Sequence, residues 1–164
     1  MIVVADASPL NYLIQIECDT LIRDLYRNVL VPAAVIEELK HPSAPATVAA
    51  WLLRLPSWID VRTVRFRDDS ALMVLDRGER EAIQLAQEQN ADLLLIDERR
   101  GRSEARVRGI STTGTLGILL AAGKRRLIDP EPAFHRLIEE TNFRAAPGVR
   151  ERFTEQCREF RWPK

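Results

Sequence analysis

Two acidic residues each stand directly after a short apolar run that reads as a buried strand. Asp6 follows IVVA at residues 2–5, and Asp97 follows LLLI at residues 93–96. Taken alone, either aspartate could simply cap a turn. In open parallel sheets, however, ligands bind beyond the carboxyl ends of the strands. If these two strands are neighbours, we expect the two carboxylates to converge there.

Further acids stand between these two strands, on predicted helices. Glu37 and Glu38 belong to PAAVIEELK, and Glu79 and Glu81 to RGEREAIQLAQEQN. A cluster of carboxylates repels itself unless a divalent cation is present, and hard oxygen ligands without His or Cys select Mg²⁺ or Mn²⁺. Such a metal can activate water and stabilise charge on a phosphoryl group. The alternative is a solvated helix face whose first-turn acids suit the helix dipole.

A hydroxyl group follows Asp6 closely. Ser8 precedes Pro9, and serine at the N-cap with proline at the first helical position is a favoured helix start. We therefore expect Ser8 to cap a helix, and the same side chain could also serve a ligand.

The elements that must position these residues alternate between short buried strands and helices. This alternation predicts parallel pairing and a three-layer α/β/α sandwich with a central parallel sheet and C-terminal helices. The strand over 59–64 is expected to be exposed or to lie at an edge. Strands are expected at 2–6, 28–32, 59–64, 91–97 and 110–114, and helices after Ser8 and at 20–26, 32–40, 46–55, 68–75, 77–90, 98–109, 115–124, 131–141 and 148–160.

The chain has 164 residues, which fits one domain with a real core. We expect a core over 1–125 and a helical extension over 126–164 that packs on the same domain. The extension could be a surface for a partner or could cover the sheet. With 46% apolar and 29% charged residues, the chain should be globular. Its formal net charge of zero gives no global field that marks a nucleic-acid or membrane binder.

Several other classes are disfavoured. The two cysteines form no Cys/His cluster, so neither zinc nor a disulfide framework is indicated, and a reducing cytoplasm is the expected location. The sequence shows no signal-peptide pattern and no run of membrane-spanning length. ADASPL lacks both the second aspartate of a HAD-type phosphatase and the acidic pair of a response-regulator receiver. GxGxxG and P-loop motifs are absent.

Four segments, in this order, resemble the motifs of PIN domains. They are VVADASPLNYL, VPAAVIEEL, GEREAIQLA and LLLIDERRGR, and GTLGILL at 114–120 is similar to a prokaryotic PIN-like subfamily. The resemblance covers roughly residues 2–125. It implies a PIN-like, Rossmann-like fold and an Mg²⁺- or Mn²⁺-dependent nuclease, often the toxin of a VapC-type toxin–antitoxin pair that cleaves RNA. A small antitoxin protein and a second copy of the chain, giving a homodimer, are the expected protein partners.

The resemblance also implies roles for particular residues, with Ser8 supporting Asp6 or a metal-bound water. For the third acid, the Ala that follows favours Glu81, whereas the GE of the subfamily favours Glu79. Many PIN domains carry a hydroxyl residue two positions before the last aspartate, where this chain has Leu95; Thr113 or Thr115 could compensate. The implied metal ligands are Asp6, Glu38, Glu81 or Glu79, and Asp97.

Arginines follow the last of these acids directly. Arg99, Arg100 and Arg102 would form a basic rim that suits the phosphate backbone of RNA. The alternative is a solvated helix face with pairs such as Glu98–Arg102. The leading hypothesis is a metal-dependent endoribonuclease. The rival is a catalytically weak PIN-fold binding module that acts through RNA or a protein partner.

Overall fold

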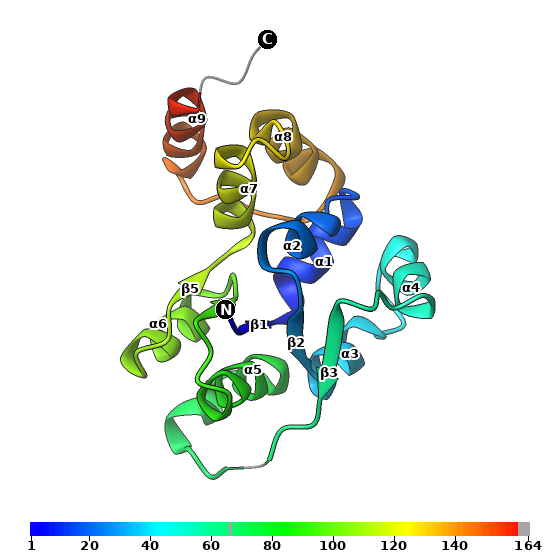
Figure 1. Ribbon diagram of the computed structural model, residues 1–164, viewed down its shortest axis with the longest axis vertical. Helices are drawn as coiled ribbons and strands as arrows, with labels where there is room; N and C mark the ends of the chain where they lie inside the picture. The colour runs from blue at the N-terminus through cyan, green and yellow to red at the C-terminus, as the bar shows by residue number, and fades with distance from the viewer. Residues whose placement is uncertain (66, 161–164) are drawn as a thin grey trace.

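The computed structural model describes residues 1–65 and 67–160 and contains one five-stranded, wholly parallel sheet (Figure 1). The strands are β1 Val3–Ala5, β2 Val29–Pro32, β3 Ile59–Arg62, β4 Leu93–Leu95 and β5 Thr112–Thr113. Their order is β3-β2-β1-β4-β5, so β1 lies at the centre. β3 lies at an edge, which agrees with the exposed or edge strand expected at 59–64. The strands are mostly apolar because both faces of a parallel sheet are covered.

Helices cover both faces of this sheet, which confirms the predicted three-layer sandwich. Val3 and Ala5 of β1 pack in one apolar cluster with α1, α2 and α7, whereas Val4 packs in a second cluster with α5 and α6. Successive side chains of a strand point to opposite faces of the sheet, so β1 is buried on both faces. The helices are α1 Ala7–Gln15, α2 Thr20–Tyr26, α3 Ala33–Leu39, α4 Ala46–Leu53, η1 Ser70–Val74, α5 Arg77–Glu88, α6 Arg99–Val107, α7 Thr115–Lys124, α8 Pro130–Glu140 and α9 Val149–Glu159.

The pairing of β1 with β4 sets the position of the two aspartates. Ala5 lies opposite Leu95 in the register, and the Asp6 backbone amide donates a 2.9 Å hydrogen bond to the Leu95 carbonyl. Asp6 and Asp97 therefore leave the sheet at the same end of adjacent strands.

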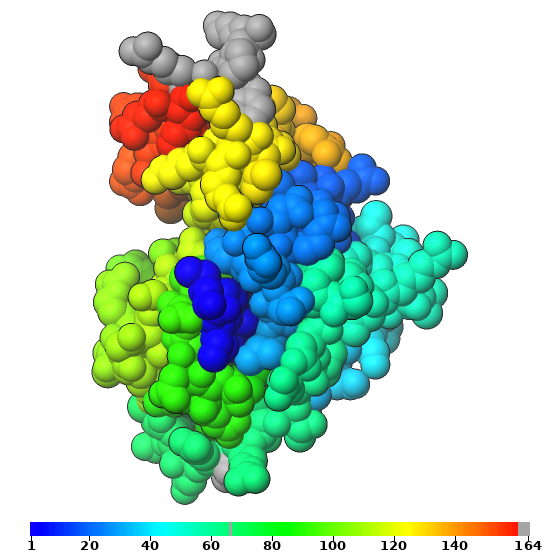
Figure 2. Space-filling model, viewed as in Figure 1, coloured from blue at the N-terminus to red at the C-terminus, as the bar shows by residue number. Residues whose placement is uncertain are grey.

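The C-terminal helices α8 and α9 pack against α7 (Figures 1 and 2). Phe134 of α8 and Phe153 of α9 are buried in the same cluster as β1, with ring centroids 4.6 Å apart. The last four residues of the expected extension, 161–164, lie outside the described residues.

Three local predictions need correction or refinement. Helix α1 begins at Ala7 with Asp6 at the N-cap, so Ser8 is not the N-cap but lies within the first turn. The helix expected at 68–75 is the short 3₁₀ helix η1. The strand expected at 110–114 is reduced to the two residues of β5. No helix in the described part of the chain is long and apolar enough to cross a membrane.

Candidate active site

The Asp6 carboxylate lies at the centre of the candidate site. The residue is 2% exposed, and its Oδ1 atom is buried without a hydrogen-bond partner. Burial raises the pKa of Asp6 well above its ordinary value, against a contact with the Ala7 amide that lowers it. The charges of Glu38, Glu79 and Asp76 raise this pKa further. A buried, unpartnered carboxylate is costly unless a cation or a proton compensates it.

Gly78, at the start of α5, brings the second acid close to Asp6. A Cβ atom at Gly78 would lie 2.5 Å from Glu38 Oε2 and 3.6 Å from each of Asp6 Oδ1 and Asp76 Oδ1. Only a residue without a side chain lets the α5 backbone approach these carboxylates so closely. Loss of water around the Glu38 carboxylate and the charge of Asp76 raise the pKa of Glu38.

The start of α5 is built by a capping box. The Asp76 side chain accepts a 2.9 Å hydrogen bond from the Glu79 amide, and the Asp76 amide donates to Glu79 Oε2 at 3.3 Å. Burial and the charges of Asp76, Glu98 and Glu38 raise the pKa of Glu79 to about 7, against the Asp76 hydrogen bond that lowers it. Asp76 was not among the predicted site residues, although the D-x-x-E spacing of a capping box is visible in the sequence.

The other candidate on α5 points elsewhere. Glu81 Oε1 accepts a 3.0 Å hydrogen bond from Arg77 Nε, and this forms a salt bridge between residues four apart on the helix. The structure thus places Glu79, and not Glu81, among the charges that act on Asp6. An α-helix has about 3.6 residues per turn, so Glu79 and Glu81, which are two positions apart, point to nearly opposite faces of α5.

Asp97 is held by the start of α7. Its Oδ1 accepts a 2.7 Å hydrogen bond from the Thr115 amide, and its Oδ2 accepts one of 2.7 Å from the Thr115 hydroxyl. Burial raises the pKa of Asp97, whereas these two bonds and the nearby Arg102 lower it. Thr115 therefore provides the hydroxyl contact to Asp97 that Leu95 cannot make.

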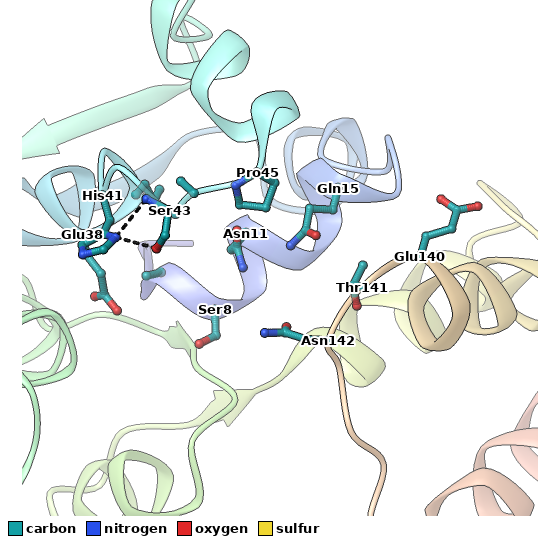
Figure 3. A pocket seen from close by; sticks show the side chains of 13 residues that line it. Ser8, Asn11, Gln15, Glu38, His41, Ser43, Pro45, Glu140, Thr141 and Asn142 are labelled. Carbon is teal, nitrogen blue, oxygen red and sulfur yellow. Dashed lines mark hydrogen bonds between the residues drawn. The ribbon is translucent and has the colours of Figure 1, made fainter.

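Two hollows lie on either side of Ser8 and Asn142, which line both. The first has a volume of about 430 Å³ and includes Glu38 in its wall (Figure 3). The second, of about 490 Å³, includes Asp97. One of the acids described above therefore borders each hollow, whereas Asp6, Asp76 and Glu79 line neither.

The second hollow holds part of the predicted basic rim. Arg99 and Arg102 line it, whereas Arg100 is exposed and does not. Arg144, from the segment between α8 and α9, adds a third guanidinium to the wall. No local pattern in the sequence connects Arg144 with Asp97, 47 residues earlier, so sequence reasoning missed it.

The residues around Asp6 fit a hard divalent cation. The unpartnered Asp6 Oδ1 and the approach of Glu38 to it supply oxygen donors of the kind that Mg²⁺ and Mn²⁺ prefer. Within residues 1–65 and 67–160, however, no group of three or more His, Cys, Asp or Glu side chains is arranged so that it could hold a metal ion.

The acids lie beyond the carboxyl ends of the central strands of a parallel sheet, which is where open α/β sheets bind their ligands. The PIN-domain family model matches residues 2–159, which includes the C-terminal helices beyond the expected limit near 125. The chain belongs to the PIN-domain family, whose members are generally nucleases that use divalent metals. No curated protein and no solved structure matches the chain significantly.

Proposed function

We propose that this protein is an Mg²⁺- or Mn²⁺-dependent endoribonuclease. The observation that carries the proposal is the buried Asp6 Oδ1 atom, which has no hydrogen-bond partner and lies beside Glu38, Glu79 and Asp76. A fold does not retain an unpartnered carboxylate among other carboxylates for stability, because each such group lowers the stability of the folded state. Membership of the PIN-domain family supports the same reading.

The proposed roles follow from what each side chain contacts. Asp6, Glu38 and Glu79 would hold the metal, which when bound activates water and stabilises charge on the phosphoryl group. Thr115 fixes the orientation of both Asp97 oxygens, so that Asp97 presents a preorganised negative charge at the edge of the second hollow. Ser8, between the two hollows, can donate a hydrogen bond to a phosphate oxygen.

The arginines of the second hollow would bind the backbone of the RNA. Arg99, Arg102 and Arg144 present guanidinium groups that suit bidentate contacts with phosphate oxygens. Their location beside Asp97 places positive charge around an otherwise acidic centre. This arrangement explains how a chain of zero net charge could bind a polyanion.

The proposal includes a biological role as the toxin of a toxin–antitoxin pair, on the basis of the resemblance to VapC-type proteins. Expression of the wild-type chain should then arrest growth of a bacterial host, and expression of Asp6→Asn should not. Equal growth of hosts that express either chain would contradict the toxin role. The nuclease proposal would then be tested by the cleavage assay alone.

Substitution of the acids tests the nuclease directly. Asp6→Asn and Glu79→Gln should lower the rate of single-stranded RNA cleavage in Mn²⁺ by about 100-fold or more, because each removes a negative charge from the metal site. Glu81→Gln is the matched control on the same helix. It removes only an exposed salt bridge with Arg77 and should keep nearly the wild-type rate.

Equal cleavage by wild type and Asp6→Asn would overturn the proposal. Loss of activity in Glu81→Gln but not in Glu79→Gln would reverse the assignment of the third acid. The rival binding module is distinguished by metal titration, since a protein that neither binds Mn²⁺ nor gains thermal stability from it would not be a metal-dependent nuclease.

A further inference from the structure

The first hollow differs in chemistry from the second, although both adjoin Ser8. Its wall contains carboxamides and hydroxyls but, among the described residues, no lysine or arginine. Its two charged residues are acids: Glu38, which the proposed function assigns to the metal, and Glu140, which would repel a phosphate. Its volume of about 430 Å³ lies within the range of roughly 300–1,000 Å³ for small-ligand pockets. The hollow therefore suits a neutral polar group.

The carboxamides in this hollow are available to a ligand. Figure 3 shows Asn11 and Gln15 of α1 and Asn142 of the α8–α9 segment turned toward the same space. The only hydrogen bonds between two of the residues drawn there join His41 and Ser43. A carboxamide both donates and accepts hydrogen bonds. Three such groups at one opening match the mixed donor and acceptor edge of a nucleobase.

The His41 ring forms a fixed, exposed surface at the same opening. Its Nδ1 accepts a 3.1 Å hydrogen bond from the Ser43 amide and lies 2.6 Å from the Ser43 hydroxyl oxygen. These contacts hold the ring in place, and in the neutral ring they leave the proton on Nε2. Proteins that bind single-stranded RNA stack unpaired bases on such side chains, His included.

The C-terminal extension holds Asn142 over α1. The Thr141 hydroxyl donates to the Leu137 carbonyl at 2.6 Å and accepts from the Phe143 amide at 3.0 Å, which fixes the turn after α8. The Phe143 ring then packs on Tyr12 of α1, with centroids 5.1 Å apart and an interplanar angle of 84°. Asn142 is thus fixed on both sides, and one wall of the hollow comes from the extension.

We propose that this hollow binds one unpaired nucleobase of the RNA, next to the phosphate that is cut, and that Asn11, Gln15 and Asn142 read its polar edge. The proposal rests on the proposed ribonuclease function. The strand would cross Ser8, with a base in the first hollow and the neighbouring phosphates beside the arginines of the second. Asn11 and Gln15 line only the first hollow and the guanidiniums line only the second, which gives the strand a direction.

Cleavage of a random-sequence single-stranded RNA pool in Mn²⁺ tests this proposal. The base frequency at each position around the cut is compared for wild type, Asn11→Ala and Asn142→Ala. Wild type should prefer particular bases at one position beside the cut by about 5-fold or more, and each variant should reduce this preference toward none. Gln87→Ala is the control, since Gln87 is exposed on α5 near residues 90–91, at the opposite end of the strands.

Binding provides a readout that does not need activity. Fluorescently labelled RNA homopentamers are titrated against the full chain carrying Asp6→Asn, alone and combined with Asn11→Ala or Asn142→Ala. Base-dependent affinity that these substitutions remove supports the nucleobase hollow, even if no RNA is cut and the nuclease proposal fails. The nucleobase proposal is overturned if neither assay shows a base preference before Asn11 or Asn142 is substituted. It is also overturned if both substitutions leave the preference unchanged. In either case the nuclease proposal stays intact.

Discussion

The Asp6 side chain contributes little to the stability of the helix that it begins. It occupies the N-cap of α1 yet makes no side-chain capping hydrogen bond, and its Oδ1 atom has no partner at all. A capping aspartate would be exposed and would accept a hydrogen bond from the first turn. The observed environment raises the pKa of Asp6, which is the observation on which its proposed functional role rests.

The pH dependence of stability should report this environment. Carboxyl groups whose folded-state pKa is raised bind more protons folded than unfolded, so their contribution to stability is present at low pH and is lost as pH rises. For Glu79, this contribution to stability is lost between its ordinary pKa of 4.5 and its raised pKa of about 7. Without metal, Asp6→Asn should therefore be more stable than wild type, by about 1–3 kcal/mol near neutral pH, and the difference should grow with pH.

Chemical denaturation of both proteins across this pH range measures the difference. The variant must be compared with wild type because other carboxyl groups respond to pH in the opposite way. Hydrogen bonds from Arg108 and Arg136 lower the pKa of Asp69 and of Glu140, so their contribution to stability is lost as pH falls. Mn²⁺ should stabilise wild type more than Asp6→Asn at the upper end of the range. A difference that shrinks as pH rises would contradict the assigned environment.

At the scale of elements, the start of α5 organises the acids. The capping box of Asp76 and Glu79 fixes where the helix begins, and Gly78 lets its backbone approach Glu38 and Asp6. Helix α6 lies on the other side of Glu79, where a Cβ atom at Gly101 would be at an ordinary contact distance of 3.7 Å from Glu79 Oε1 but only 2.5 Å from Ile96 Cδ1. Gly78 thus sets how closely α5 approaches the acids, whereas Gly101 lets α6 pack on Ile96.

The substitution Gly78→Ala tests the close approach at α5. The new methyl group would meet Glu38 Oε2 at 2.5 Å, and because that atom is the end of a flexible side chain, Glu38 should rotate away while the protein stays folded. Alanine also has the higher helix propensity, by up to about 1 kcal/mol. We expect wild-type or greater thermal stability, with Mn²⁺ affinity reduced about 10- to 100-fold by calorimetric titration.

Gln87→Ala, at an exposed position of the same helix, is the control for propensity alone. It should leave Mn²⁺ affinity unchanged. If Gly78→Ala also bound Mn²⁺ as wild type does, Glu38 would not be a metal ligand.

At the scale of the whole molecule, the C-terminal helices belong to the core. Phe134, Leu137 and Phe153 are buried in the cluster that contains β1, and the segment between α8 and α9 lines both hollows. The family match over residues 2–159 agrees with this continuity. The site is therefore completed by residues that lie far along the chain from the four motif segments.

The substitution Phe134→Ala measures how much the packing of the C-terminal helices contributes to the stability of the core. Phe134 is 1% exposed, so Phe134→Ala should lower the free energy of unfolding by about 3–5 kcal/mol in denaturant titrations. The exposed neighbour His135→Ala should change it by no more than about 0.5 kcal/mol. A cost below about 1 kcal/mol for Phe134→Ala would mean that the extension is a separable module.

The sequence by itself determined the parallel sandwich and the position of Asp6 and Asp97. Both follow from local patterns, because short apolar runs separated by amphipathic helices have one favourable way to bury both faces of a sheet. The motif order also pointed to the PIN-domain family, and the family match bears this out.

Only the tertiary structure decided which helical acid faces Asp6. Glu79 and Glu81 share the start of one helix, and the rotation of α5 against the sheet, fixed by the capping box and by packing, turns Glu79 inward and leaves Glu81 with Arg77. The positions of Asn142 and Arg144 likewise depend on contacts between α1 and the distant α8–α9 segment. Such long-range contacts are set by packing of the whole core, which no local pattern of residues encodes.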